Sequence, residues 1–245
     1  MASSGATIHA VAPDLRVCTT RPMPPLSTAL EGEIDRLWAR AQAHTGGKLF
    51  NGQVFCADVI TPTLLCGHWS EYRRVVAQMA RHDLFTELGQ RALAVGGMIR
   101  CADGIVFGRR PADAVYQPGE WQLPPAGAVD AAAARPGGSV DVFATLFAEL
   151  GEELGLAPSD VHSRRLLCLV EHASCGVGSH VLDLGIALAT DLSAAALRAR
   201  HAAAGNDEYA GLEIVPVAEL PGFLAREAAT LNVQAPIFLR HAGLL

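Results

Sequence analysis

The 245-residue sequence lacks several features that define common protein classes. It has no run of about 18 uncharged apolar residues, so no membrane-spanning helix is predicted. Its six cysteines include no C-x-x-C pair, which argues against a zinc site and against a disulfide framework. Charged residues make up only 18 % of the chain and the net charge is −6, a balance that does not favour nucleic-acid binding.

The start of the chain also lacks a basic segment followed by an apolar run, the pattern of a secretory signal. A cytoplasmic protein with reduced, mostly buried thiols is therefore expected. Apolar residues make up 50 % of the sequence, enough for a substantial core. The length allows one large domain, or a compact domain with a smaller one.

The first region of the chain is predicted to be α+β and to end near residue 90. Residues 1 to about 30 are rich in Ser, Thr and Pro, which predicts an irregular or extended lead-in. Asn51-Gly52 is typical of a tight turn between paired strands. The predicted elements are a helix over 29–44, paired strands over 49–68 and a helix over 70–88.

A second region, 91–245, alternates strands with helices and returns to a strand late, which predicts an α/β (α+β) fold with a mixed sheet between helices. Ala102-Asp103-Gly104 predicts a hairpin turn. Ser139 is the expected N-cap of a helix over 140–154, and Gly155 its C-terminal cap. The other predicted elements are strands over 166–173, 180–190 and 212–217, a link over 174–179, and helices over 192–203 and after 221.

The helix predicted over 140–154 carries a cluster of glutamates beside an apolar stripe. Glu149 lies one turn from both Glu152 and Glu153, and like charges at that spacing cost about a few tenths of a kcal/mol each. Two interpretations are open. The glutamates form either a solvated helix face or a site for a divalent cation, and oxygen ligands favour magnesium or manganese over zinc.

Residues 149–156, ELGEELGL, resemble the second half of the Nudix box. The full pattern is G-x5-E-x7-R-E-U-x-E-E-x-G-U, in which U is apolar. The Gly/Pro-rich loop before the helix agrees with that resemblance. It implies a Nudix-type α/β/α sandwich with a mixed sheet over 91–245, preceded by a smaller region, 1–90, as the substrate-specificity element.

The first half of the box departs from the family pattern. Ala148 stands in place of the arginine, and Val140 in place of the earlier glutamate. The opening glycine fits best at Gly127, in LPPAGAVD, with an insertion over 128–138; an alternative alignment uses Gly137-Gly138. Because the missing arginine orients a metal-binding carboxylate in the family, its loss leaves the metal affinity and the turnover rate open.

Three flanking stretches are similar to a divergent Nudix branch that includes an animal UDP-glucose/UDP-galactose pyrophosphatase. They are LFNGQVF (49–55), HWSEYR (68–73) and DGIVFGRR (103–110). That branch also has an interrupted box without the arginine. The resemblance extends from about residue 48 to the end of the sequence, and it implies a UDP-sugar as the substrate.

The resemblance implies roles for particular acidic residues. Glu149, Glu152 and Glu153 match positions that hold magnesium, with the main-chain carbonyl near Gly127 as a further candidate ligand. Glu152 and Glu153 are also expected to take part in catalysis. Glu208, in the loop before the last strand, is expected to be either a metal-bound or base glutamate or a solvated loop acid.

Other residues are candidates for contacts with the substrate. Arg109 and Arg110 end a strand, and because strand side chains alternate, only one of them is expected to face the functional side. His172 and His180 flank the 174–179 link and are candidates, with a structural role as the alternative. Stacking on a uracil or packing in the core is open for three aromatic residues, Phe50, Trp69 and Trp121.

The sequence therefore predicts a magnesium-dependent hydrolase that cleaves the diphosphate bond of a UDP-sugar, with UDP-glucose giving UMP and glucose 1-phosphate. Two alternatives stay open. One is a Nudix diphosphatase for ADP-ribose, CoA or an isoprenyl diphosphate; the other is a catalytically silent Nudix-fold binding protein. The expected partner is a small-molecule diphosphate, without nucleic acid or membrane, and a homodimer is left open.

Overall fold

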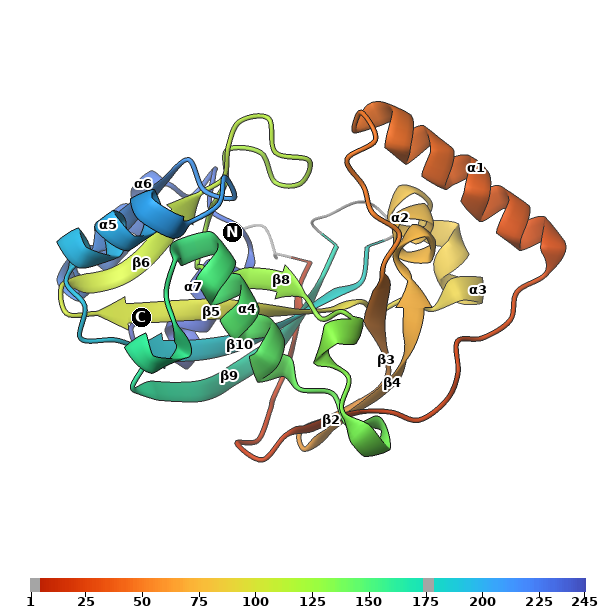
Figure 1. Cartoon of the computed structure of the whole chain (residues 1–245), viewed down its shortest axis with the longest axis horizontal. Helices are drawn as coiled ribbons and strands as arrows, with labels where there is room; N and C mark the ends of the chain where they lie inside the picture. The colour runs from red at the N-terminus through yellow and green to blue at the C-terminus, as the bar shows by residue number, and fades with distance from the viewer. Residues whose placement is uncertain (1–4, 174–178) are drawn as a thin grey trace. The chain divides into compact units, whose positions relative to one another are not determined.

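The computed structural model describes residues 5–173 and 179–245 and divides the chain into two compact units (Figure 1). The first unit includes residues 128–142 and 171–182 as well as the N-terminal part up to Ala94. The second holds residues 95–127, 143–170 and 183–245. Residues 174–178 of the predicted 174–179 link, with Cys175, lie outside the described residues. The domain boundary at residue 90 stays a prediction.

In its described residues the first unit contains a three-stranded sheet of order β2-β4-β3 and the α-helices α1, α2 and α3 (Figure 1). Strand β2 is parallel to β4, whereas β3 and β4 form an antiparallel pair. A cluster of apolar residues joins α1 to the following helices: Ile34, Leu37, Ala77, Leu84 and Leu88. The bounds are β2 Arg16–Thr19, α1 Thr28–His44, β3 Gln53–Thr61, β4 Leu64–Glu71, α2 Tyr72–Ala80 and α3 Phe85–Leu88.

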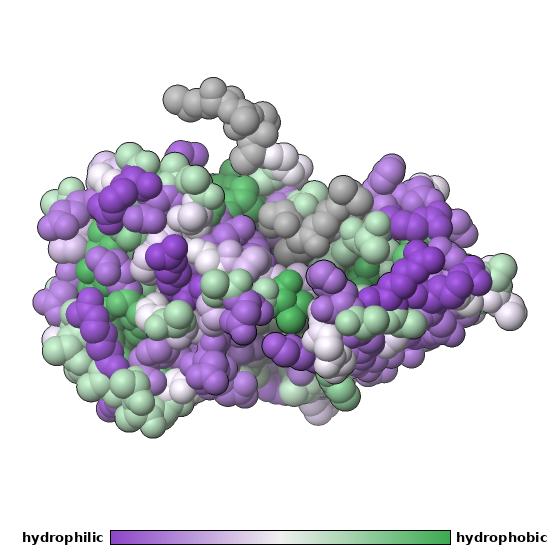
Figure 2. All heavy atoms as spheres, turned by 90° about the horizontal axis from the view of Figure 1, so that it is seen from above, coloured by the Kyte–Doolittle hydropathy of each residue, from purple (hydrophilic) through white to green (hydrophobic). Residues whose placement is uncertain are grey.

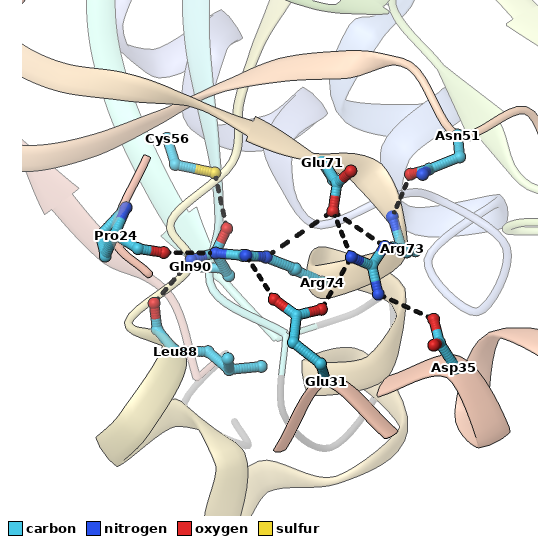
Figure 3. A network of polar contacts seen from close by, with 10 residues as sticks. All are labelled: Pro24, Glu31, Asp35, Asn51, Cys56, Glu71, Arg73, Arg74, Leu88 and Gln90. Carbon is cyan, nitrogen blue, oxygen red and sulfur yellow. Dashed lines mark hydrogen bonds and ion pairs between the residues drawn. The ribbon is translucent and has the colours of Figure 1, made fainter. Parts of the chain in front are cut away.

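A polar network also ties α1 to α2 (Figure 3). The Arg73 guanidinium donates to Asp35 at 2.8 Å and to Glu31 at 2.7 Å. Arg74, only 4 % exposed, donates to the other oxygen of Glu31 at 2.6 Å and to the carbonyl oxygen of Pro24. These charges are therefore neutralised within the unit and hold α1 in place.

The lead-in, predicted to be irregular or extended, contains two short extended strands, β1 (Thr7–His9) and β2, whose partner strands lie far along the sequence. Two other predictions for this unit were wrong. Asn51-Gly52 makes no hairpin turn; the Asn51 side chain instead accepts a hydrogen bond from the Arg73 amide at 2.8 Å. The helix over 70–88 begins at Tyr72 and is broken at Arg81, whose backbone is extended.

The second unit carries most of the larger sheet, whose strand order is β1-β9-β10-β5-β6-β11. Strand β7 pairs with β6, and β8 pairs with β5. The hairpin of β5 and β6 turns at Ala102-Asp103, as predicted. The strands are β5 Leu93–Cys101, β6 Gly104–Arg109, β7 Trp121–Gln122, β8 Ala126–Ala128, β9 Ser163–His172, β10 Val181–Ala189 and β11 Gly211–Val215.

Both faces of strand β5 are covered. A Cβ at Gly96 would meet the Phe238 ring of α7 at 2.8 Å, whereas one at Gly97 would meet Pro125, just before β8. Because neighbouring residues of a strand point to opposite faces, the Phe238 ring of α7 and the Pro125 ring lie on opposite faces of β5. The helices are α4 Val142–Leu154, α5 Ala194–Ala204, α6 Leu220–Arg226 and α7 Gln234–His241. The predicted mixed α/β architecture is confirmed.

The ends of α4 test the two predicted caps. The helix begins at Val142, so Ser139 is too far upstream to be its N-cap and that prediction was wrong. Gly155 ends the helix with a φ of 65° and donates its amide to the Gly151 carbonyl at 3.0 Å, which confirms the C-terminal cap.

No helix in the described ranges is long and apolar enough to cross a membrane. The face seen in Figure 2 mixes strongly hydrophilic residues with apolar ones. Large apolar side chains exposed within the described part of the chain are scattered along the sequence: Ile8, Phe50, Val59, Val115 and Leu245. Such single exposures are ordinary for a protein surface.

Candidate functional site

Helix α4 brings Glu149 against Gly127. Its apolar stripe, Leu146, Leu150 and Leu154, is at most 1 % exposed, and this burial fixes the rotation of the helix. A Cβ at Gly127 would lie 1.8 Å from Oε1 of Glu149, so the carboxylate occupies space that only glycine leaves open. The sequence alignment paired these two residues as the opening glycine and the first glutamate of the ELGEELGL segment.

Glu153 is the buried carboxylate of the site, with 1 % of its surface exposed. Both of its oxygens lie 3.2 Å from the Ala126 amide, which donates to them. Burial raises the pKa of Glu153 well above the ordinary value, and the charge of Glu149 raises it further. Two acidic side chains, Glu149 and Glu153, are thus brought together at one place.

Tyr209 holds Glu153 from the other side. Its hydroxyl donates to Glu153 and accepts from Gln122 Nε2 at 2.8 Å. The tyrosine is 3 % exposed, and a Cβ at Gly108 would lie 2.4 Å from its ring. Burial raises the pKa of Tyr209 well above the ordinary value, so the neutral hydroxyl is the form that donates.

Glu208 and the two arginines lie around this centre in different ways. Glu208 is paired with Arg110, whose Nε also donates to the Tyr116 carbonyl at 2.8 Å. Its charge contributes to the raised pKa of Glu153, so Glu208 is close enough to act on that carboxylate. Arg109 is exposed and lies over the Trp121 ring at 5.5 Å. Only one of the two arginines was expected to face the functional side, and Arg110 is the one that lies beside Glu208.

Glu152 is exposed, one residue from the buried Glu153. Its main-chain carbonyl accepts from the Asn206 amide at 2.7 Å, which connects α4 to the loop that carries Glu208. Across the described residues, no three His, Cys, Asp or Glu side chains are arranged to hold a metal ion. Glu149 and Glu153 lie close enough for the charge of one to raise the pKa of the other.

These residues fit a hard divalent cation in donor chemistry. The donors are carboxylate oxygens, which suit magnesium or manganese rather than zinc. The place that Gly127 leaves open receives Glu149. Burial is the main cause of the raised pKa of Glu153, and the charge of Glu149, which adds to it, is one that a cation would offset. Glu149 and Glu153 would supply the first ligands, with Glu152 and the Gly127 carbonyl as the predicted additions.

The histidine candidates belong to the first unit. His172 is buried at the end of β9. His180 stacks on Phe85 with ring centroids 3.7 Å apart and forms a 2.9 Å hydrogen bond with Glu171. His9 and Arg91 also contact Glu171, so this cluster is a structural anchor for β1.

The three aromatic candidates differ in how they are packed. Trp69 packs edge-on against Phe55, and Trp121 packs against Phe223 while its Nε1 donates to Glu227 at 3.1 Å. Phe50 is 83 % exposed. Two of the three therefore pack against other aromatic rings, which leaves Phe50 as the aromatic candidate with an open face.

Sequence reasoning missed Tyr209, Gln122 and the Ala126 amide. One signal was available for Tyr209, because a glycine inside a strand, here Gly108, often marks a close approach by another group. Gln122 follows the Trp121 of a two-residue strand and carries no distinctive pattern.

No model of a known protein family matches the chain, and no curated protein matches it in sequence. Similar solved structures include a MutT Nudix hydrolase from Burkholderia pseudomallei, 23 % identical with a TM-score of 0.44, covering 62 % of this chain and 98 % of that one. The Nudix domain of Shewanella oneidensis NrtR, in complex with ADP ribose, is 13 % identical with a TM-score of 0.45, covering 67 % and 97 %. A C. elegans Ap4A hydrolase is 16 % identical with a TM-score of 0.40, covering 62 % and 95 %. Similarity at this level does not extend to activity or substrate.

Proposed function

We propose that this chain is a Nudix-type diphosphatase that depends on magnesium or manganese and cleaves a nucleoside diphosphate derivative. The observation that carries the proposal is the pairing of Glu149 with Gly127 beside the buried Glu153. A bound divalent cation would neutralise charge on the phosphoryl oxygens of a diphosphate. The ELGEELGL resemblance and the mixed α/β fold support the same conclusion.

The chain's own residues position the carboxylates. The Ala126 amide and the Tyr209 hydroxyl hold Glu153 from two directions. Glu153, with Glu152, is also proposed to take part in catalysis beside the cation. Glu152 and Glu208 complete the proposed acidic set. Arg110, already beside Glu208, and the exposed Arg109 are the proposed contacts to phosphate oxygens.

The proposed substrate is a UDP-hexose, with UMP and glucose 1-phosphate as the products from UDP-glucose. The support for this choice is the similarity of the 49–55, 68–73 and 103–110 segments to the UDP-sugar branch. ADP-ribose, CoA and isoprenyl diphosphates remain the alternatives within the same chemistry. His172 is proposed as a further contact to the substrate.

A second candidate function is binding without turnover. It is favoured by Ala148 at the arginine position, by the exposure of Glu152 and by the pairing of Glu208 with Arg110. In that case the acidic cluster would bind a metal–nucleotide complex and leave it intact. Calorimetry with UDP-glucose and magnesium, run beside an assay of turnover, separates the two functions.

The test is phosphate release, coupled to a phosphomonoesterase, over UDP-glucose, ADP-ribose, CoA and an isoprenyl diphosphate, with and without magnesium. Glu153→Gln should lower turnover by about 10²-fold or more, as loss of a key electrostatic group does, while the fold is kept. The matched control is Glu213→Gln, because Glu213 is an exposed glutamate on β11. Unchanged turnover in Glu153→Gln refutes the proposal, and heat of binding without release from any compound supports the second candidate.

A further inference from the structure

Two cysteines of the first unit lie side by side although they are far apart in the sequence. Cys18 of β2 and Cys66 of β4 are direct partners in the parallel register of these strands. Their Sγ atoms are 3.3 Å apart. Both side chains are half-buried, so a small molecule in solution has access to them.

The other cysteines within the described residues differ from this pair. Cys56, Cys101 and Cys168 are at most 5 % exposed. Burial raises the pKa of Cys168 to about 12, and burial together with the charge of Asp58 raises that of Cys56 to about 12. Buried, protonated thiols react slowly, because the thiolate is the nucleophile.

The backbone geometry allows a bond between the two sulfurs. Neighbouring strands lie about 4.7–4.9 Å apart, and disulfides join residues whose Cα atoms are about 4.4–6.8 Å apart. β2 and β4 can therefore be bridged without separating the strands. The 3.3 Å between the sulfurs is a contact between reduced thiols, which the structure records as a hydrogen bond.

We propose that Cys18 and Cys66 are a redox-modification site, at which a hydroperoxide converts the adjacent thiols into a reversible intramolecular disulfide. In the first step one thiolate attacks a peroxide oxygen. The S–O bond forms, the O–O bond breaks, and the leaving oxygen departs as water, or as the alcohol for an organic hydroperoxide. The second sulfur then attacks the sulfenic sulfur, and the S–S bond forms as the S–O bond breaks and a further water leaves. The peroxide gains the two electrons that the thiols lose.

The surroundings keep the pair reduced until an oxidant is present. Partial burial and the adjacent Cys18 thiol raise the pKa of Cys66, while the charge of Arg16 lowers it. The thiolate fraction at neutral pH is therefore small, and the second sulfur lies at once beside any sulfenic acid that forms. This arrangement favours the disulfide over further oxidation to a sulfinic acid.

The disulfide would act on β2, which is an edge strand of its sheet. The other side of β2 contacts the 138–140 segment, where the Val140 amide donates to the Val17 carbonyl at 2.9 Å and Thr19 Oγ1 donates to the Gly138 carbonyl at 3.2 Å. A Cys18–Cys66 bond would therefore join β4 covalently to the strand that also holds the 138–140 segment. Because it would close a long loop, it should also raise the midpoint of thermal unfolding by several degrees.

The experiment treats the full chain with hydrogen peroxide, blocks free thiols with iodoacetamide, and maps the tryptic peptides. Cys56 and Cys66 share the tryptic peptide 49–73, so fragment ions must show the link at Cys66 and the alkyl group at Cys56. The expected product has lost two hydrogens, links Cys18 to Cys66, and returns to the starting mass with dithiothreitol. Cys18→Ser should lose the link and leave a sulfenic acid at Cys66 that dimedone traps, whereas Cys101→Ala, a buried control, should keep the link.

Three results would overturn the proposal. One is oxidation of Cys56, Cys101 or Cys168 before the pair. The second is linkage between chains in place of linkage within one chain. The third is protection of both thiols by stoichiometric zinc that co-purifies with the chain, because the pair would then be a metal site. The mapping of the unsubstituted chain decides the question even if the serine variant fails to fold.

Discussion

Substitution of Gly127 by alanine separates the position of Glu149 from its charge. Gly127 is not among the residues with positive φ, so its backbone accepts alanine. The added Cβ would lie 1.8 Å from Oε1 and 2.3 Å from Cδ of Glu149. Real Cβ contacts are essentially never below 3.0 Å, so the carboxylate oxygen must move by about 1.2 Å.

A displacement of that size sets the expected loss of activity. A misplacement of about 1 Å in a catalytic constellation can cost about 10²-fold in rate, which corresponds to about 2.7 kcal/mol of transition-state stabilisation. The free energy of unfolding should change by less than about 1 kcal/mol, since Glu149 is half-buried at the end of a flexible side chain. Activity and stability should therefore separate in this variant.

The assay measures kcat/KM for UDP-glucose with magnesium, or for whichever diphosphate the panel identifies, beside the urea midpoint of unfolding. Gly211→Ala is the matched control, because a Cβ there meets nothing within 4 Å. Adding Glu149→Asp to Gly127→Ala shortens the crowded side chain and should recover part of the lost rate, a coupling that independent sites would not show. Full activity in Gly127→Ala, or equal losses in both glycine variants, would refute the reasoning.

Three further predictions concern stability. Tyr209→Phe leaves the buried Gln122 donor without its acceptor, and should lower the free energy of unfolding by about 1–3 kcal/mol in urea titrations. Adding Gln122→Leu should recover part of the lost stability, and a double variant with no recovery would contradict the contact between the two side chains. Burial raises the pKa of Glu171, but the hydrogen bond with His180 and its other basic contacts outweigh burial and hold the pKa below its ordinary value. The resulting stability is present above the unfolded pKa and lost as the pH falls through the folded one, so Glu171→Gln should flatten the acid loss below about pH 5; parallel pH profiles would count against this. Gly155→Ala forces a side chain into φ 65° and within 2.8 Å of a carbonyl oxygen, and should cost at least about 1 kcal/mol by thermal unfolding, with Gly222→Ala as the tolerant control.

The parts of the fold that the sequence predicted are those with a local signal. Helix α4 was predicted because its apolar residues recur at helical spacing and Gly155 follows them, and the β5–β6 hairpin because Ala102-Asp103-Gly104 marks its turn. Strands β1 and β2 were predicted only as parts of an irregular or extended lead-in, because they are short and their partners, β9 and β4, are distant in the sequence. The tight turn predicted at Asn51-Gly52 does not form, because the long-range contact between Asn51 and Arg73 overrides this local signal.

In the candidate site, too, the contacts with a local sequence signal were predicted and the long-range contacts were not. The pairing of Gly127 with Glu149 followed from a motif, although an insertion separates its halves. Tyr209 reaches Glu153 only because β6 and β11 are neighbours in the sheet, a relation that no short segment of sequence contains. Whether Glu152 and Glu208 join a metal site depends on a cation, and their roles stay predictions.

The first unit is assembled from three separate stretches of chain, and this has a consequence for how the protein is made. The Phe55 amide donates to the Val129 carbonyl, and the Leu182 amide donates to the Ala92 carbonyl. During synthesis the N-terminal stretch therefore waits, with these groups unpaired, until residue 182 has left the ribosome. A fragment that ends at residue 90 would lack the same partners. The unit is therefore not one continuous segment of sequence that recombination could transfer whole.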